Sequence, residues 1–249
     1  MDKKDLQNPA LYTNRELSWL LFNKRVLSEA RDKQLLLFER LKFLSITASN
    51  LDEFFMVRIG SLVDMIHAEY TKKDIAGMSA KEQLDALMEE THKFAALQYS
   101  TYNRMLLPQL RANGLNFVEH HEQLTERQAQ YVDEYFEENV YPVLTPMAVD
   151  SSRPFPLIRN KTLNIGALVA KKGEKDTEIE FATVQVPSVL PRVVRIPAAK
   201  EGDTEVAVLL LEEIIERNIS KLFLNYNVLC AHPFRITRNA DLAIDEDEA

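Results

Sequence analysis

The chain has 249 residues, of which 46% are hydrophobic, and it contains only 6 glycines and 10 prolines. This composition excludes a disordered chain and argues against a turn-rich all-β fold. The formal net charge of −8 lacks the basic excess that binders of nucleic acid and other polyanions usually carry. We therefore expect no nucleic-acid partner.

The sequence has no recognisable targeting segment and no pair of cysteines that could form a disulfide. The polar start MDKKDLQNPA predicts no signal peptide. No apolar run approaches the roughly 18 residues of a transmembrane helix. The single cysteine, Cys230, excludes an internal disulfide and fits a reducing cytoplasm.

The first part of the chain has helical periodicity. Apolar residues at helical spacing predict helices over residues 15–31, 35–47 and 50–70. Ser49 or Asn50 can serve as the N-cap of the third helix, because a short polar side chain there accepts a hydrogen bond from an exposed backbone amide. We predict an all-α helical bundle over residues 1–110.

Two capping boxes mark later helix starts. Ser79 with Glu82 and Thr125 with Gln128 have the S/T-x-x-E/Q spacing, in which each side chain bonds the backbone amide of the other residue. The helix that follows Ser79 is expected to end near Pro108, because proline lacks the amide that a helix interior requires. The helix that follows Thr125 is expected to stop before residue 142.

The second part of the chain has strand signals. The proline-bearing stretch over residues 141–156 predicts a rigid extended connection. The acidic residues 245–248 fit either a solvated tail or the first turn of a helix that continues beyond this chain. Together these features predict an α+β domain over residues 111–249. Its expected elements are strands at 163–169, 179–186, 193–196, 205–210 and 234–238, and a helix at 211–218.

Motifs for catalysis and metal binding are missing. The sequence has no glycine-rich phosphate loop, no C-x-x-C and no H-E-x-x-H. His120 and His121, beside Glu119 and Glu122, could bind a metal, but a solvated turn is the favoured interpretation. We therefore predict no catalytic and no metal-binding residue. His67 and His92 lie on predicted helices, where a surface or packing role is the favoured interpretation, and His232 is assigned no role.

The most informative stretch is Ser49-Asn-Leu-Asp-Glu-Phe-Phe-Met-Val-Arg58. It resembles the N-terminal signature of polyphosphate kinases of the histidine-phosphorylating class. Further segments resemble the same family, in the same order: Arg15–Asn23, Leu37–Leu44, Leu144–Asp150, Arg153–Pro156 and Phe234–Asp241.

The resemblance implies an enzyme that reversibly transfers the γ-phosphate of ATP to inorganic polyphosphate through a phosphohistidine, so that it is a phosphoprotein, with Mg²⁺ as cofactor. It implies a helical N-terminal domain, a head domain that forms a homodimer, and two further C-terminal domains. It also implies a cytoplasmic protein, with peripheral attachment to the inner membrane as an option.

The resemblance makes Asn50 a binding residue for the adenine of ATP or ADP, because an amide offers a donor and an acceptor together. Phe43 corresponds to a family aromatic near the base, although a core position would also explain it. Arg40, Lys42 and Arg58 could face phosphates, but solvated helix charges are the favoured interpretation.

The family's catalytic histidine and metal-binding groups belong to its C-terminal domains. We therefore expect this chain to be a truncated fragment that supplies part of the adenine pocket and the dimer contacts and is inactive alone. The alternative is a non-catalytic dimerisation or interaction module in which Asn50 is a structural helix cap. A third option, an unrelated helical adaptor, requires the ordered matches to be coincidental.

Overall fold

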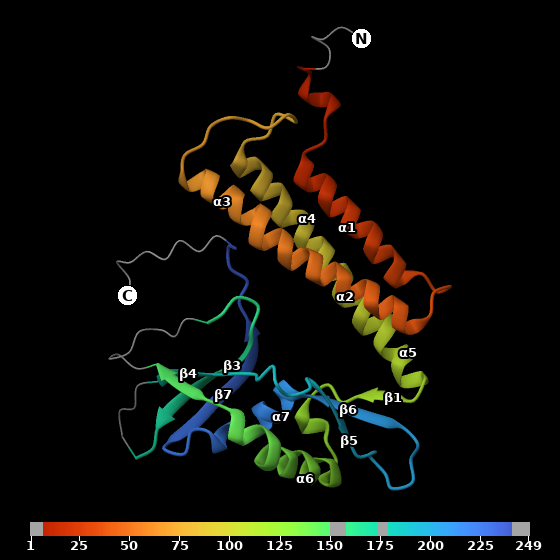
Figure 1. Ribbon diagram of the computed structural model, residues 1–249, viewed down its shortest axis with the longest axis vertical. Coiled ribbons are helices and arrows are strands. Elements are labelled where there is room, and N and C mark those ends of the chain that lie inside the picture. Colours follow the sequence, from red (N-terminus) through yellow and green to blue (C-terminus); the bar gives the residue numbers. More distant parts are fainter. Residues whose placement is uncertain (1–6, 150–157, 174–178, 241–249) are drawn as a thin grey trace. The chain divides into compact units, whose positions relative to one another are not determined.

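The computed structural model describes residues 7–149, 158–173 and 179–240. These form two compact units (Figure 1). Unit 1 contains the described residues up to Gln109 together with residues 237–240, and unit 2 is Leu110–Ile236. The segments 153–156 and 245–248, which the sequence analysis singled out, lie outside the described residues.

Unit 1 is helical. Helix α1 lies beside both α2 and α4 (Figure 1), and Asn14 caps it by accepting from the amides of Glu16 and Leu17 at 3.0 and 2.9 Å. The 3₁₀ helix η2 and the π-helical turns η3 and η4 complete the unit. The bounds are η2 Pro9–Leu11, α1 Arg15–Arg31, α2 Leu37–Phe54, η3 Phe55–Ile59, α3 Gly60–His67, α4 Ala80–Thr101, η4 Tyr102–Leu106 and α5 Leu107–Ala112.

The expected helix break near Asn50 is wrong. Helix α2 runs through Asn50 to Phe54 and continues through η3 into α3, so Asn50 is not an N-cap. A polar residue caps a helix only when its side chain bonds a nearby backbone amide at the start of that helix. The Asn50 side chain instead bonds a residue of α1, and the buried face of α2 continues past it.

The expected helix stop near Pro108 is also wrong. The helical backbone passes from α4 through the π turn η4 into α5, which contains Pro108 and ends at Ala112. A π turn changes the hydrogen-bond spacing, so it can absorb the missing amide of a proline one turn later. Both capping boxes are confirmed, at Ser79 for α4 and at Thr125 for α6.

Residues 237–240 complete unit 1. The Ala240 amide donates to the Met56 carbonyl at 2.9 Å, and Asn239 Nδ2 donates to Asp64 Oδ2 at 3.1 Å. A Cβ at Gly60 would lie 2.6 Å from Asn239 Oδ1, so a larger residue here would have to displace the Asn239 side chain.

The described residues of unit 2 form two sheets together with helices α6 and α7. In the three-stranded sheet, β6 lies between β1 (parallel) and β5 (antiparallel). The four-stranded antiparallel sheet has the order β2-β4-β3-β7. The bounds are β1 Leu115–Phe117, η5 His121–Gln123, α6 Glu126–Tyr135, η6 Phe136–Val140, η7 Tyr141–Val143, β2 Pro146–Val149, β3 Leu163–Lys171, β4 Ile179–Gln185, β5 Val193–Ile196, β6 Val206–Leu210, α7 Leu211–Arg217, η8 Ile219–Lys221 and β7 Tyr226–Arg235.

The expected α+β class is confirmed, and most strand predictions agree with the structure. The last strand is misplaced, because β7 begins at Tyr226 and ends at Arg235 instead of covering 234–238. Strands β1 and β2 were not expected. Each is short, and each pairs with a strand far along the chain, so local pattern could not identify it. Among the described residues, no helix combines the length and hydropathy that a membrane span requires.

The two units have different cores. Unit 2 has one continuous apolar cluster, which includes Phe136, Ile165, Leu209 and Ile214. Unit 1 has two smaller clusters. One contains Leu20, Phe54, Ile59, Leu62, Ala80 and Leu87, and the other contains Leu27, Ala30 and Phe94.

Candidate functional site

Polar side chains lie between the two apolar clusters of unit 1. On α1, the fully buried Asn23 stands between Leu20 of one cluster and Leu27 of the other. On α2, Thr47 is fully buried and Asn50 partly buried. A polar group in a helical core is costly unless it is hydrogen-bonded, so their partners matter.

These side chains form one hydrogen-bond network. Asn50 Nδ2 donates to Asn23 Oδ1 at 3.0 Å, and Asn23 Nδ2 donates to the Thr47 carbonyl at 3.1 Å. Gln98 of α4 donates from Nε2 to Thr47 Oγ1 at 2.9 Å, and that hydroxyl donates to the Leu44 carbonyl at 2.7 Å. The network therefore joins α1, α2 and α4.

The network fixes the orientation of the Asn50 amide. The Thr47 carbonyl can only accept, so Asn23 must point its NH₂ group at Thr47 and its oxygen at Asn50. Asn50 must then point its own NH₂ group at Asn23. Its carboxamide oxygen accepts no hydrogen bond from any described residue, and one N–H of the same group is also left over.

Asn50 lines a cavity of about 230 Å³ between α1 and the α2–η3 segment. Three aromatic side chains line it beside polar and charged ones, and Trp19 stacks on Phe54 with ring centroids 4.3 Å apart and planes 8° apart. Charged groups lie at Glu53 and Arg58. The lining residues are Trp19, Phe22, Asn50, Glu53, Phe54, Val57 and Arg58. An amide beside aromatic faces is suited to a flat, uncharged, polar-edged ligand group.

The structure separates the other residues that the sequence analysis named. Phe43 lies about two helical turns before Asn50, and it packs against the cluster of Leu27, Ala30 and Phe94 and is not part of the cavity lining. Arg58 lines the cavity, 4.0 Å from Glu16. Thus the structure brings Arg58, but not Phe43, to Asn50.

Arg40 is neither a phosphate-facing residue nor a solvated helix charge, so both expectations for it are wrong. Lys42, in contrast, is solvated. The Arg40 side chain is only 2% exposed. Its Nε donates to the Ala30 carbonyl at 3.0 Å and its Nη1 to Gln109 Oε1 at 2.8 Å. It therefore ties the end of α1 to α5 instead of facing solvent or a phosphate. Lys42 is exposed and pairs with Glu39 at 2.8 Å.

Sequence reasoning missed Asn23 and Trp19. A signal for Asn23 was available, because the residue falls at the core spacing between Leu20 and Leu27. Leu21 and Lys24, which lie beside these positions on the same helix, are both exposed.

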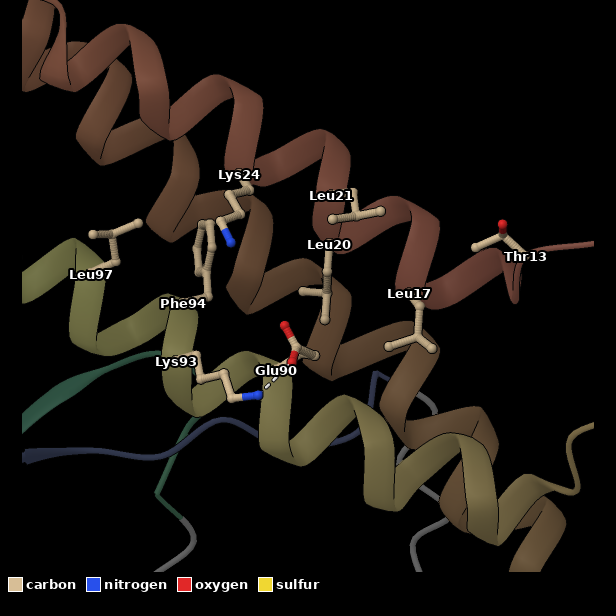
Figure 2. Close-up of a pocket in the computed structure, with 9 residues that line it drawn as sticks. All are labelled: Thr13, Leu17, Leu20, Leu21, Lys24, Glu90, Lys93, Phe94 and Leu97. Atoms are coloured by element: carbon tan, nitrogen blue, oxygen red, sulfur yellow. Dashed lines mark hydrogen bonds and ion pairs between the residues drawn. The ribbon is translucent and has the colours of Figure 1, made fainter.

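A second cavity in unit 1 lies between α1 and α4 and measures about 310 Å³ (Figure 2). Leucines and Phe94 form its walls, with Lys24, Glu90 and Lys93 among the lining residues. Lys93 Nζ pairs with Glu90 at 2.8 Å and with Glu89 at 2.7 Å, and these bonds raise the pKa of Lys93 above its usual range. Two of the charged groups at this cavity, Glu90 and Lys93, pair with one another, so its lining indicates a ligand class less clearly than the site around Asn50 does.

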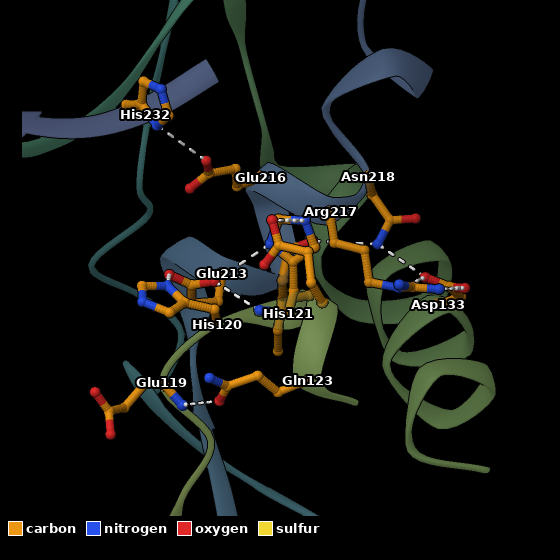
Figure 3. Close-up of polar contacts among 12 residues, drawn as sticks. Glu119, His120, His121, Gln123, Asp133, Glu213, Glu216, Arg217, Asn218 and His232 are labelled. Carbon is orange, nitrogen blue, oxygen red and sulfur yellow. Dashed lines mark hydrogen bonds and ion pairs between the residues drawn. The ribbon is translucent and has the colours of Figure 1, made fainter. Parts of the chain in front are cut away.

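Unit 2 contains a cluster of histidines and carboxylates (Figure 3). The Glu213 carboxylate of α7 accepts from the His121 backbone amide at 2.9 Å and lies 3.2 Å from His121 Nδ1. His120 Nδ1 lies 3.7 Å from Glu213 Oε1. His232 of β7 lies 3.4 Å from Glu216.

Two carboxyl groups in this part of unit 2 have pKa values shifted in opposite directions. Burial, and next the Glu213 carboxylate, raise the pKa of Glu216 above its ordinary value. The opposite holds for Asp133 of α6, where the Arg217 guanidinium lowers the pKa of the carboxyl group. Arg217 Nε and Nη2 donate to Asp133 Oδ1 and Oδ2 at 2.8 and 2.9 Å, and Figure 3 shows this pair beside the cluster.

Comparisons with known proteins cover nearly the whole chain. Residues 12–118 match the family of the polyphosphate kinase N-terminal domain, and residues 127–249 match that of the polyphosphate kinase middle domain. Two similar curated proteins are the polyphosphate kinases of Halalkalibacterium halodurans and Lactiplantibacillus plantarum. They are 47% and 48% identical over 98% and 95% of this chain.

A solved structure is also similar, the crystal structure of polyphosphate kinase from Porphyromonas gingivalis. It matches with a TM-score of 0.80 and 31% sequence identity over 94% of this chain. This chain spans 34% of that structure and 34% and 32% of the two curated relatives. It thus corresponds to about a third of the length of these proteins.

Proposed function

The chain belongs to the polyphosphate kinase family, and from that premise we propose that it forms the adenine side of the nucleotide site in an enzyme that transfers phosphate between ATP and polyphosphate. The matched relatives carry that enzyme name. The proposal includes the reversible reaction through a phosphohistidine. The groups that perform this chemistry are proposed to lie outside this chain, so the chain alone would be inactive.

The observation that carries the proposal is the orientation of the Asn50 amide on the wall of an aromatic cavity. Asn23 holds the NH₂ group and leaves the carboxamide oxygen available. Adenine offers an amino donor beside a ring-nitrogen acceptor, and an asparagine amide can pair with both. Guanine presents a carbonyl where adenine has the amino group, so it would meet the Asn50 oxygen with a second acceptor.

The neighbouring residues would complete base binding. The exposed Phe22 ring and the Trp19 ring, which stacks on the buried Phe54, line the same cavity and would pack against a purine. Phe43 packs with Leu27, Ala30 and Phe94 outside this cavity, so under this proposal it would support the base site only through helix packing. The lining includes one carboxylate, Glu53, which is too few ligands for a magnesium site, so Mg²⁺ would arrive with ATP and is assigned no residue here.

The test is Asn50→Ala in the complete enzyme that carries this chain. Losing one or two hydrogen bonds of about 0.5–1.5 kcal/mol each should raise the KM for ATP roughly tenfold and reduce the preference for ATP over GTP. Asn139→Ala, a change at an exposed asparagine, is the matched control and should leave both values unchanged. An unaltered KM and an unaltered nucleotide preference in Asn50→Ala would overturn the proposal.

A second candidate function is an interaction or dimerisation module without a nucleotide site. Its support is the bond from Asn50 to Asn23, which gives Asn50 a structural role even though it caps no helix. In that case Asn50→Ala would lower the melting temperature and leave nucleotide kinetics intact.

The remaining family properties are also proposals. We propose that residues 1–110 and 111–249 act as separate domains, that the second domain provides homodimer contacts, and that the enzyme works in the cytoplasm or attached to the inner membrane. Sedimentation of the complete enzyme, and of a variant with altered exposed residues in unit 2, would test the dimer contacts.

A further inference from the structure

The buried acids of unit 2 differ in their cationic partners. Glu212, which is 5% exposed, forms a two-pronged pair with Arg192 at 2.6–3.2 Å. Glu213 is 9% exposed, but its partners among the described residues are only histidines. An imidazole is positively charged only when it is protonated, whereas a buried carboxylate requires a positive partner.

The two oxygens of Glu213 have different surroundings. Oε2 accepts from the backbone amide and lies beside Nδ1 of His121, at 2.9 and 3.2 Å. Oε1 accepts no hydrogen bond from the described residues, and His120 Nδ1 lies 3.7 Å away. One oxygen is therefore held in place while the other faces a second potential metal ligand.

Ligand atoms of His120, Glu122 and Glu213 all lie within 4.8 Å of one another. Around a tetrahedral zinc ion with bonds of about 2.0–2.1 Å, ligand atoms are separated by about 3.3 Å. The side chains of His120 and Glu122 are 66% and 71% exposed, so small rotations can close the remaining distance without changing the core.

We propose that His120, Glu122 and Glu213 bind a divalent first-row transition-metal ion, with His121 as a positioning residue for Glu213. One imidazole and two carboxylates form a mixed nitrogen and oxygen set, which suits zinc and its first-row neighbours better than magnesium. The ion would bridge the Glu213 carboxylate to two exposed side chains, His120 and Glu122. It would also join the η5 turn to α7, which lie about 90 residues apart along the chain.

The contacts of His121 with the Glu213 carboxylate support its role as a positioning residue. Metal-binding carboxylates are usually hydrogen-bonded to a neighbouring group, and losing that group typically lowers metal affinity 10–100-fold. His121 contacts Glu213 Oε2 through both its backbone amide and its ring. This site is independent of the nucleotide proposal, because all its residues lie in unit 2.

The test is calorimetric titration of Zn²⁺ into the chelator-treated 249-residue chain. We expect one saturable equivalent, and Glu213→Gln should weaken its affinity by about tenfold or more. His120→Ala should also weaken Zn²⁺ binding, and it should leave the fold intact because this side chain is largely exposed. His232→Ala is the matched control, since His232 is also exposed and faces a different carboxylate, Glu216.

Positioning by His121 has its own readout. His121→Ala should weaken Zn²⁺ binding about tenfold, and His121→Asn should restore much of it, because an asparagine amide can donate from nearly the same place as Nδ1. The visible spectrum of bound Co²⁺ should change in Glu213→Gln and stay unchanged in His232→Ala. Absence of saturable Zn²⁺ binding, or equal affinity in wild type, His120→Ala and Glu213→Gln, overturns the proposal.

Discussion

Unit 1 and unit 2 bury polar groups of different kinds. Among the described residues of unit 1, the buried polar side chains are amides, hydroxyls and Arg40, with no carboxylate. In unit 2 they include two carboxylates, Glu212 and Glu213. The amides of unit 1 divide its core into two clusters, whereas the acids of unit 2 lie beside a single continuous cluster.

The difference shows two uses of buried polarity. A network of neutral amides fixes the direction of donors and acceptors without placing charge in the core, which suits recognition of an uncharged base edge. Buried carboxylates instead need cations, and within the described part of unit 2 Arg192 pairs with Glu212, whereas the ion-pair partners of Glu213 are histidines. Changes in each unit can test this contrast.

The largest expected effect comes from the continuous core of unit 2. Phe136 is fully buried there, so Phe136→Ala should lower the free energy of unfolding by about 3–5 kcal/mol. Guanidinium unfolding followed by circular dichroism measures this loss. Phe38→Ala, at a side chain that is 63% exposed, should change the stability far less. Equal effects of the two substitutions would refute the assigned core.

A smaller effect is expected from the amide network of unit 1. Asn23→Leu leaves the Thr47 carbonyl and the Asn50 amide without their partner and should lower stability by about 1–3 kcal/mol. Adding Asn50→Leu should recover part of that loss, since an apolar pair leaves fewer unpaired polar groups. Strictly additive losses in thermal unfolding would show that the two amides do not act together.

The smallest expected effect is the contribution of two acids in unit 2, Asp133 and Glu216, to the pH dependence of the unfolding free energy. The pKa of Asp133 is lowered below its ordinary value of 3.8 in the folded state. Its stabilising contribution is therefore present above that value and is lost as the pH falls through the folded pKa. The difference in unfolding free energy between wild type and Asp133→Asn should stay constant near neutral pH and shrink below about pH 4.

Glu216 should behave in the opposite sense. Its folded pKa is raised above the ordinary value of 4.5, so ionisation of its carboxyl group destabilises the fold as the pH rises through that range. Glu216→Gln should therefore stabilise the protein at neutral pH relative to acid pH. Measurements with chelator present should give opposite pH trends for the two substitutions, and parallel trends would contradict the assigned environments.

Local signals in the sequence determined three of the helix starts but misplaced one near Asn50. The capping boxes at Ser79 and Thr125 and the first helix at Arg15–Arg31 are found where they were predicted. Each depends on contacts within a few residues, so a short stretch of sequence is sufficient. The α+β class followed in the same way, because strand alternation and helical periodicity are both local.

Tertiary structure alone decided which polar residues are buried and what they meet. The signature around Asn50 identified the residue, but its role as a network member and not a cap depends on Asn23, which lies on another helix. Arg40 is buried because α1 and α5 meet around it. His121 and Glu213 come together across a long chain separation. Such contacts depend on how elements pack, and a pattern read along one segment contains no information about the partner segment.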